Sequence, residues 1–225
     1  MPRVSVEEFI EAEEFTYDTI CADGNVLVEN ICQYHPRPLM TKMHEWISPN
    51  TMALRDLGAP DLQAGRALGA AAGKALGFRD GFTHMEWYRK ADGEAVFGEI
   101  GARPPGGRMV DAMNYATDAD LFSGWAEAIT HGRITQPVER RYNAGIVFKR
   151  AEGTGRITGY AGLDHLMAEF GEHVAAIDLL PVGTPRRDWR AVTISDGMVV
   201  VRHPELAKTV EMTERFAAEL HLYAG

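Results

Sequence analysis

The chain has 225 residues, of which 45% are hydrophobic and 24% are charged, so it can bury a core in one large domain or two small ones. Its formal net charge is −9, the first 30 positions hold eight acidic residues and one basic residue, and no basic stretch follows, which argues against nucleic acid and anionic membranes as partners. No apolar run approaches the ~20 residues of a membrane helix and the N-terminus lacks a signal-peptide pattern, so we expect a cytoplasmic protein without a membrane segment.

Strands are predicted at the start of the chain. An apolar and β-branched pattern favours a strand over residues 4–10. Residues 14–22 and 25–34 are two further strand-like runs, and the dipeptide Asp23-Gly24 between them is typical of a two-residue hairpin turn. We therefore expect a strand followed by a hairpin.

Cys21 and Cys32, the two cysteines of the chain, lie on the two arms of this hairpin. A two-residue turn places Cys21 opposite Val26 and Cys32 opposite Phe15. At ~3.4 Å per residue the two thiols are then on the order of 20 Å apart, which is too far for a disulfide. We expect both thiols to be reduced, as is usual in a reducing compartment.

The rest of the chain alternates helical and strand-like patterns after an irregular stretch over residues 36–58. In chain order we expect a helix over 60–76, strands over 82–90 and 94–103, helices over 109–116 and 118–131, strands over 143–150 and 156–161, a helix over 163–170, strands over 174–181 and 191–202, and a helix over 204–222. The pattern predicts an α+β fold in which helices flank an antiparallel sheet.

A change of composition predicts a domain boundary near residue 135. Residues 135–142 contain Pro137 and a charged cluster, as is typical of a connector. We expect a main domain over residues 1–135 and a small α+β domain, rich in strands, over residues 136–225.

The second predicted hairpin carries the most informative pattern. A turn at Asp92-Gly93 places Glu86 opposite Glu99 on neighbouring strands, with both side chains on one face. Two carboxylates about 5 Å apart repel unless a proton or a cation lies between them. Mg²⁺ suits this position because it takes one or two carboxylates together with phosphate oxygens. The pattern also allows a solvated strand face, or a surface ion pair between Glu99 and Arg103.

Further polar groups lie on this face or directly after it. His84 is expected opposite Gly101 on the carboxylate face, where it either contacts a substrate or makes a structural hydrogen bond. Gly106 and Gly107 precede a predicted helix, and glycines there expose backbone N–H groups that can bind an anion. Together with Arg103 they form a candidate site for a carboxylate or a phosphoryl group, or else a rigid turn between strand and helix.

The sequence of residues 83–87 and 96–107, THMEW and VFGEIGARPPGG, resembles the metal-binding hairpin of the ATP-grasp ligases. The likeness is greatest to carboxylate–amine ligases of the L-amino-acid ligase type, and residues 143–202 resemble the C-terminal domain of that group more weakly. Such enzymes use Mg·ATP to activate a carboxylate as an acyl-phosphate, which an amine then attacks. The resemblance implies ATP and Mg²⁺, or Mn²⁺ in its place, as cofactors, and a small carboxylate and an amine as substrates.

The resemblance also implies a role for each polar residue of the hairpin. It makes Glu86 and Glu99 the metal ligands, Arg103 the catalytic residue that stabilises the transferring phosphoryl group, and His84, Gly106 and Gly107 substrate-binding residues. The family commonly has asparagine as a further metal ligand where this chain has Gly101, which implies a weaker metal site or one completed by water.

A second resemblance lies at the N-terminus. Residues 6–16, VEEFIEAEEFT, resemble the nucleotide-binding hinge of the family. The resemblance implies that Glu7 and the backbone amide of Ile10 bind adenine and that Glu14 binds the ribose hydroxyls. His35 follows the first hairpin, where relatives often have a polar residue near the phosphates; a surface histidine is the alternative.

The resemblance covers nearly all of this chain but only the C-terminal half of such a ligase. We therefore expect the C-terminal part of an ATP-grasp ligase, with the missing N-terminal half or a partner chain as its partner, that is inactive by itself. One alternative is an incomplete or non-catalytic half that binds a nucleotide or a partner. Another is an ATP-grasp ligase with bicarbonate or ammonia as acceptor, similar to biotin carboxylase or carbamoyl-phosphate synthase. The identity of the acid and amine stays open, as does the oligomeric state, a homodimer included.

Overall fold

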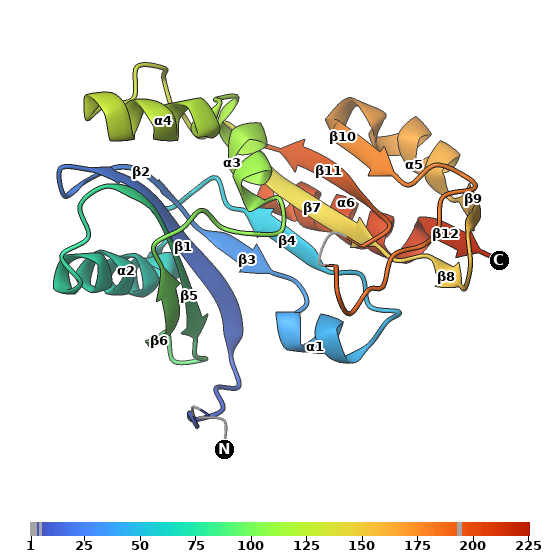
Figure 1. Cartoon of the computed structure of the whole chain (residues 1–225), viewed down its shortest axis with the longest axis horizontal. Helices are drawn as coiled ribbons and strands as arrows, with labels where there is room; N and C mark the ends of the chain where they lie inside the picture. The colour runs from blue at the N-terminus through green and yellow to red at the C-terminus, as the bar shows by residue number, and fades with distance from the viewer. Residues whose placement is uncertain (1–3, 5, 193–194) are drawn as a thin grey trace.

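A large antiparallel sheet runs through most of the molecule (Figure 1). The structure, a computed structural model, describes residue 4, residues 6–192 and residues 195–225. Within these residues the sheet has nine strands: β1 (Glu13–Ala22), β2 (Asn25–Asn30), β3 (Cys32–Tyr34), β4 (Asn50–Ala53), β5 (Gly81–Arg89), β6 (Ala95–Gly101), β7 (Asn143–Lys149), β10 (Val174–Leu179) and β11 (Gly197–His203). Their order is β10-β11-β7-β4-β3-β1-β5-β6, and β2 pairs with β1 beside β3. The predicted α+β class with an antiparallel sheet is confirmed.

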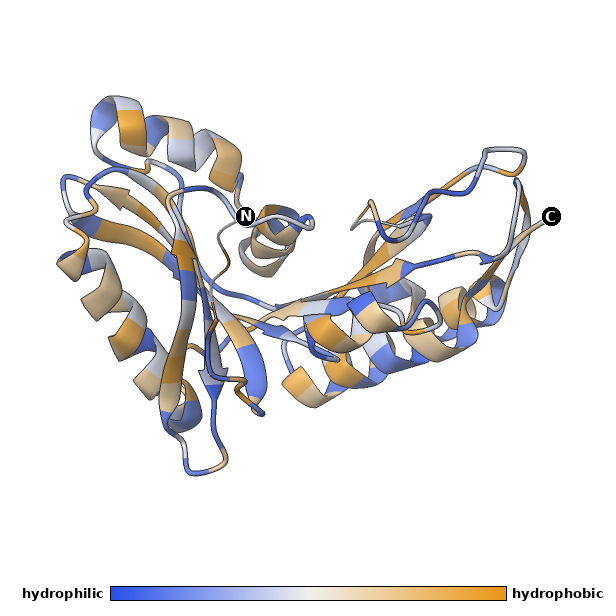
Figure 2. Ribbon diagram, turned by 60° about the horizontal axis from the view of Figure 1, so that its bottom comes forward, coloured by the Kyte–Doolittle hydropathy of each residue, from blue (hydrophilic) through white to orange (hydrophobic). Residues whose placement is uncertain are grey.

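A second, small sheet lies at the C-terminal end of the molecule. It contains β8 (Glu152–Gly153), β9 (Ile157–Ala161) and β12 (His221–Ala224), with β12 in the middle. The helices are α1 (Pro38–Met43), α2 (Gln63–Ala75), α3 (Met109–Thr117), α4 (Leu121–His131), α5 (Leu163–Phe170) and α6 (Leu206–Glu219), with two short 3₁₀ turns, η1 (Pro60–Leu62) and η2 (Gly171–His173). Figure 2 shows hydrophobic and hydrophilic residues alternating along these elements, as packing on a sheet requires.

Helices cover the two faces of the large sheet. On one face α2 packs on β1 and β5, and α6 packs on β7 and β11. On the other face α3 packs on β4, β7 and β11, and α4 packs on β1 and β5. On β1 and β5, α2 covers one face with apolar contacts. The other face of the same strands, on the side of α3 and α4, carries the polar residues of the candidate site.

Several predicted elements were wrong. The stretch over residues 36–58, expected to be irregular, contains α1 and β4, and β4 forms because it pairs with β3 and with β7, which is distant from it in the sequence. Among the described residues of the predicted strand 4–10 there is no strand, because both edges of β1 are already paired, by β2 and β3 on one side and by β5 on the other. The strand predicted from residue 191 begins only at Gly197, after a turn at Ser195 and Asp196; residues 193–194 lie outside the described part. The last helix ends at Glu219 rather than at residue 222, because the chain turns there into β12.

The first hairpin has the predicted turn and a shifted register beyond it. Cys21 pairs with Val26 as expected, but an irregularity between Ile20 and Cys21 shifts the pairing by one residue. Phe15 therefore pairs with Gln33 instead of Cys32. Both cysteines are free, as predicted, and both are buried; burial raises the pKa of the Cys32 thiol to about 12.

The large sheet crosses the predicted boundary near residue 135. Strand β4 pairs with β7, so that Met52 lies opposite Gly145. The predicted units 1–135 and 136–225 thus share one sheet, and their separation into two domains stays a prediction. In the part of the chain that the structure describes, no helix combines the length and the apolar character needed to cross a membrane.

Two glycines of α2 allow this helix to lie close to the sheet. A Cβ atom on Gly65 would be 2.2 Å from the buried ring of Trp87, and one on Gly69 would be 2.2 Å from the ring of Tyr17. A Cβ atom on Gly73, in the same helix, would meet nothing within 4 Å. The small residues of α2 therefore set its distance from β1 and β5 only where it faces the sheet.

We expect Gly65→Ala to lower the free energy of unfolding by about 1–3 kcal/mol, because the added methyl group forces the helix away from Trp87. Gly73→Ala is the matched control, which should be neutral or stabilise the protein by up to about 1 kcal/mol, since alanine favours the helix. Urea unfolding curves of the two variants test this. Equal effects of both substitutions would contradict the close packing of α2.

Candidate functional site

Carboxylates gather on one face of the neighbouring strands β1, β5 and β6. The register places Thr16 beside Glu86 and Glu86 beside Glu99, so the predicted opposition of the two glutamates is confirmed. Two residues along the strands, Asp18 lies beside His84 and His84 beside Gly101, also as predicted for the second pair. We call this surface the acidic face; its carboxylates are Glu14, Asp18, Glu86 and Glu99.

A buried ion pair anchors the acidic face. Asp18 is fully buried, and His84 is 3% exposed. The Nδ1 atom of His84 donates to Oδ1 of Asp18 at 2.6 Å. The other oxygen, Oδ2, accepts from Thr16 Oγ1 at 2.8 Å and from Asn30 Nδ2 at 2.9 Å. The carboxylate is thus completely satisfied inside the protein, as a buried charge must be.

The same imidazole links the buried pair to Glu86. Its Nε2 atom lies 3.6 Å from Oε1 of Glu86, and the hydroxyl of Tyr34 donates to that oxygen at 3.0 Å. Burial opposes the charged imidazole, but Asp18 and Glu86 together raise the pKa of His84 to about 9. The interaction with His84 is in turn the main cause that holds the pKa of Glu86 below its usual value. A cationic histidine between two carboxylates therefore keeps Glu86 ionised and oriented.

At the other end of the face, Glu14 and Ile10 are brought together by Arg37. The Nη2 atom of Arg37 donates to the carbonyl of Ile10 at 2.8 Å, and its Nε atom lies 3.6 Å from Oε2 of Glu14. The guanidinium also lies over the rings of Phe9 and Tyr88, at 5.7 and 5.6 Å from their centroids. Burial, followed by the charge of Glu86, raises the pKa of Glu14.

Two other residues predicted to bind the nucleotide lie elsewhere. Glu7 is exposed in the segment before β1. His35 is half-exposed, and its Nε2 atom lies 3.5 Å from Oε1 of Glu214 on α6, which covers the opposite face of the sheet. The structure thus does not bring His35 to the acidic face.

The residues after β6 extend the acidic face with groups that can bind an anion. Arg103 is exposed and lies over Gly101, where an added Cβ atom would be 3.4 Å from its Cγ atom. One N–H of its guanidinium donates to the carbonyl of Pro104 at 3.0 Å. Gly106 has open space around it, Gly107 has a positive φ of 57°, and α3 begins two residues later without a side-chain cap. Unpaired backbone N–H groups at such a helix start favour anions.

The arrangement of Glu86 and Glu99 fits Mg²⁺ when phosphate oxygens complete its shell. Glu99 is exposed and makes no hydrogen bond or ion pair among the described residues, and Oε2 of Glu86 is equally without a partner there. Within the described ranges, no three His, Cys, Asp or Glu side chains are grouped to hold a metal without further ligands. Proteins that bind Mg²⁺ together with a nucleotide usually coordinate it through one or two carboxylates.

Asp18, Tyr34 and Arg37 were missed by the sequence analysis. A signal existed for Asp18, because Glu14, Thr16 and Asp18 alternate with Phe15 and Tyr17 and so mark a polar face on β1. Tyr34 and Arg37 carry no such signal. They reach the site because β3 lies beside β1, a contact that local patterns do not reveal.

We expect Asp18→Ala to lower the free energy of unfolding by about 3 kcal/mol or more, because it removes the buried carboxylate to which His84, Thr16 and Asn30 all donate. Asp61→Ala, which removes the exposed partner of Arg89, serves as control and should cost less than about 1 kcal/mol. Chemical unfolding of both variants measures the difference. A small loss for Asp18→Ala would contradict the buried ion pair.

Comparisons with known proteins found a similar curated sequence and many similar folds. No protein-family model matches the chain. Over 108 residues the chain is 34% identical to an L-arginine-specific L-amino acid ligase of Bacillus subtilis, and this stretch covers 47% of the chain and 25% of the ligase. In fold, the chain is similar to an L-amino acid ligase from Bacillus licheniformis, with a TM-score of 0.75, 18% identity, and coverage of 96% of this chain and 55% of that one.

A solved structure of a second kind of enzyme has the same fold. Phosphoribosylglycinamide synthetase from Anaerococcus prevotii has a TM-score of 0.74 and 13% identity, with coverage of 97% of this chain and 55% of that one. The chain therefore spans about half the length of these solved relatives, and its match to the Bacillus subtilis ligase spans a quarter of that protein.

Proposed function

We propose that the chain is part of an ATP-grasp carboxylate–amine ligase, as its likeness to L-amino acid ligases supports, and that its acidic face holds the metal and the phosphates of Mg·ATP. The observation that carries the proposal is the opposition of Glu86 and Glu99 on β5 and β6, with oxygens of both carboxylates unpaired. Glu86 is oriented by Tyr34 and His84, while Glu99 is exposed and free to bind. When bound, Mg²⁺ supplies charge neutralisation between the phosphates.

Arg103, in this proposal, stabilises the phosphoryl group during transfer. Its guanidinium is exposed and has a single hydrogen bond, to the carbonyl of Pro104, so further N–H groups are free to bind an oxyanion. Gly106 and Gly107 lie directly before α3, where backbone N–H groups can bind the carboxylate substrate. The burial of His84 between Asp18 and Glu86 favours a role in positioning the metal ligand over contact with the substrate.

The nucleoside is assigned to Ile10 and Glu14 at the other end of the acidic face, and to Glu7 in the exposed segment before β1. Two of these, Ile10 and Glu14, already share a polar partner in the guanidinium of Arg37. This contact supports the assignment because it holds the carboxylate of Glu14 close to the backbone of Ile10, whose amide is the group assigned to adenine. Glu14 can accept hydrogen bonds from ribose hydroxyls there, and we leave His35 out of the site because its side chain contacts α6.

The substrate class follows from the relatives rather than from the site. The matched Bacillus subtilis protein is a ligase of L-arginine, which supports an amino acid as the carboxylate. A carboxylate oxygen would attack the γ-phosphorus of ATP and release ADP; the amine would then attack the acyl carbon, form the amide and release phosphate. Because the chain spans about half of its solved relatives, we propose that this reaction needs the remainder of such a ligase, and that the chain alone binds nucleotide without ligation.

The binding test is a calorimetric titration with ADP, with and without Mg²⁺. We expect Mg²⁺-dependent binding by the natural chain that Glu99→Gln weakens by about tenfold or more, because half of the metal's protein ligands are lost. Glu94→Gln is the matched control on the same hairpin, since Glu94 is exposed and its carboxylate pairs with Lys90. Binding without dependence on Mg²⁺, or equal effects of the two variants, would refute the assignment.

The proposed lack of ligation is tested separately. The purified chain is incubated with Mg·ATP and a mixture of L-amino acids, and the release of phosphate and the formation of dipeptides are measured. We expect neither above the rate of a sample without protein. Formation of a dipeptide by this chain alone would contradict the proposal that the remainder of the ligase is required.

A further inference from the structure

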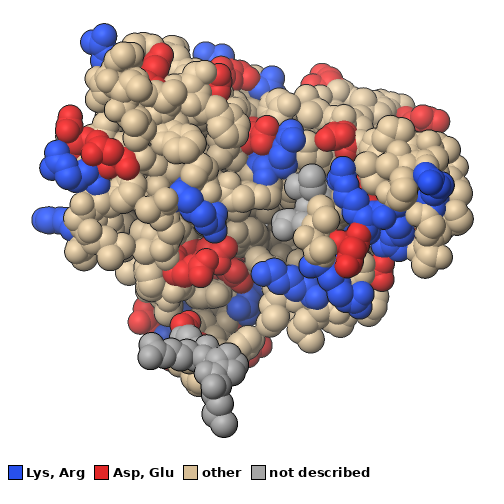
Figure 3. Space-filling view, in the orientation of Figure 1, with Lys and Arg blue, Asp and Glu red and all other residues tan. Residues whose placement is uncertain are grey.

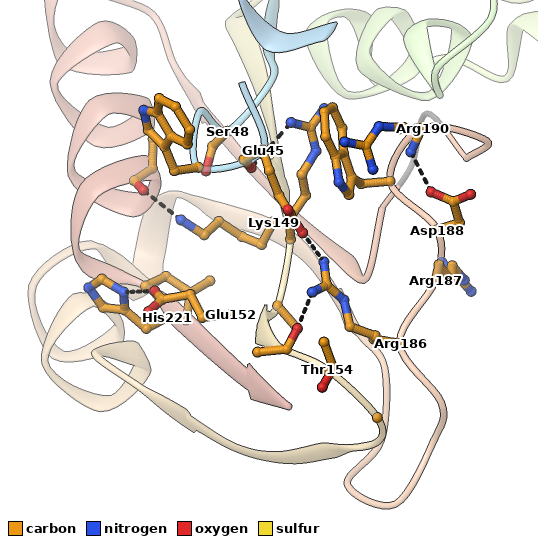
Figure 4. Close-up of a pocket in the computed structure, with 18 of the residues that line it drawn as sticks. Glu45, Ser48, Lys149, Glu152, Thr154, Arg186, Arg187, Asp188, Arg190 and His221 are labelled. Atoms are coloured by element: carbon orange, nitrogen blue, oxygen red, sulfur yellow. Dashed lines mark hydrogen bonds and ion pairs between the residues drawn. The ribbon is translucent and has the colours of Figure 1, made fainter. Parts of the chain in front are cut away.

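A cavity of about 970 Å³ lies in the C-terminal half of the molecule, away from the acidic face (Figure 4). Its walls come from the loop after α1, the end of β7 with β8, the loop before β11 and the last turn of α6. The volume is at the upper end of the range for small-molecule sites, about 300–1,000 Å³. None of the residues of the proposed nucleotide site lines it.

A buried cation forms one wall of the cavity. Lys149, the last residue of β7, is 6% exposed, and its Nζ atom donates to the carbonyl of Ala217 in α6 at 2.5 Å. This contact uses one of the three N–H groups of the ammonium. Lys149 makes no ion pair with any described carboxylate, and burial lowers its pKa to about 8. A buried ammonium without a counter-charge is costly, and an anion in the cavity would remove that cost.

Two arginines on another wall also lack a carboxylate partner. The guanidiniums of Arg150 and Arg190 lie 4.6 and 4.5 Å from the ring centroid of Trp189. Arg150 donates through Nη1 to backbone carbonyls of the loop after α1, at Thr41 and His44 among others, while its Nε atom is buried without a hydrogen-bond partner among the described residues. Hydrogen bonds to carbonyls and contact with a ring hold these side chains in place, and neither guanidinium forms an ion pair with a described carboxylate.

The carboxylates of the cavity are already engaged. Glu45 pairs with Arg186 at 2.6 Å, and Glu152 pairs with His221 at 2.7 Å (Figure 4). Asp188 accepts a hydrogen bond from the backbone N–H of Arg190. Figure 3 shows basic side chains gathered on the side of this face that belongs to the C-terminal half, although the chain as a whole has a net charge of −9. The excess of cations at the cavity is therefore local.

From this cluster we infer that the cavity binds a small phosphate-bearing polyanion, with Lys149, Arg150 and Arg190 supplying the positive charge. Guanidinium and ammonium groups bind phosphate through charge-assisted hydrogen bonds, and three of them on one cavity match a ligand of several negative charges. Trp46, which is 80% exposed at the rim, adds a flat apolar surface against which a ring of the same ligand can pack. The inference is independent of the proposed nucleotide site.

The probe is pyrophosphate, which carries several negative charges like the proposed ligand. EDTA is present to remove Mg²⁺, so that pyrophosphate cannot bind through a metal ion at the acidic face. Tryptophan fluorescence and calorimetry follow the titration, since Trp189 contacts both arginines. We expect saturable binding that Arg190→Gln weakens by about tenfold, the effect of one charge-assisted hydrogen bond. Arg190 is exposed, so the variant should fold; Arg133→Gln, on an exposed arginine outside the cavity, is the matched control and should bind as the natural chain does.

Three results would overturn the inference. One is the absence of saturable binding at millimolar pyrophosphate. Another is equal affinity in the Arg190→Gln and Arg133→Gln variants, which would mean that the anion binds elsewhere. The third is that citrate, a polyanion without phosphate, binds as tightly as pyrophosphate. Unchanged pyrophosphate affinity in Glu99→Gln would support the inference and separate it from the proposed Mg·ATP site.

Discussion

The register of β1, β5 and β6 is the constraint on which the candidate site depends. Side chains alternate between the two faces of a strand, so a slip of one residue would turn Glu86 or Glu99 to the face covered by α2. The ion pair of Asp18 and His84 opposes such a slip, because it would leave two charged groups buried and apart. The same pair extends through His84 to Glu86, so one buried contact both fixes the register and orients a proposed metal ligand.

The local part of this arrangement could be predicted from the sequence. The hairpin around Asp92-Gly93 brings Glu86 and Glu99 onto neighbouring strands, because β5 and β6 are joined by a few residues. Their exact opposition needs more than this turn. Next to the turn Trp87 pairs with Phe97, one residue off the predicted register, and the irregularity between Glu86 and Trp87 shifts the pairing back so that Glu86 lies opposite Glu99. All the α-helices except α1, and most strands, were also predicted, from periodicity and from capping residues.

The non-local part could not be predicted. Asp18 meets His84 because β1 lies beside β5, and Tyr34 reaches Glu86 because β3 lies beside β1; both pairings join segments that are far apart in the sequence. The same limitation explains the strand that was wrongly expected at residues 4–10. Its composition suits a strand, but composition does not show whether a neighbouring strand is free to pair with it.

The molecule separates two kinds of charge. Carboxylates that suit a metal ion gather on β1, β5 and β6, at one end of the large sheet, whereas a cavity beyond β7 is lined by Lys149, Arg150 and Arg190, which form no ion pair with a described carboxylate. Because β4 pairs with β7, one continuous sheet joins the two regions. The geometry thus supports a metal and nucleotide site at one end and an anion site at the other, held in one framework.

The central claim is that Glu86 and Glu99 hold a metal ion together with nucleotide phosphates. The most direct measurement is a crystal structure of the chain grown with ADP and Mn²⁺, in which anomalous scattering locates the metal. The account predicts a peak between β5 and β6, about 2.1 Å from carboxylate oxygens of both glutamates. A metal held by the nucleotide alone, or by other residues of the chain, would contradict it.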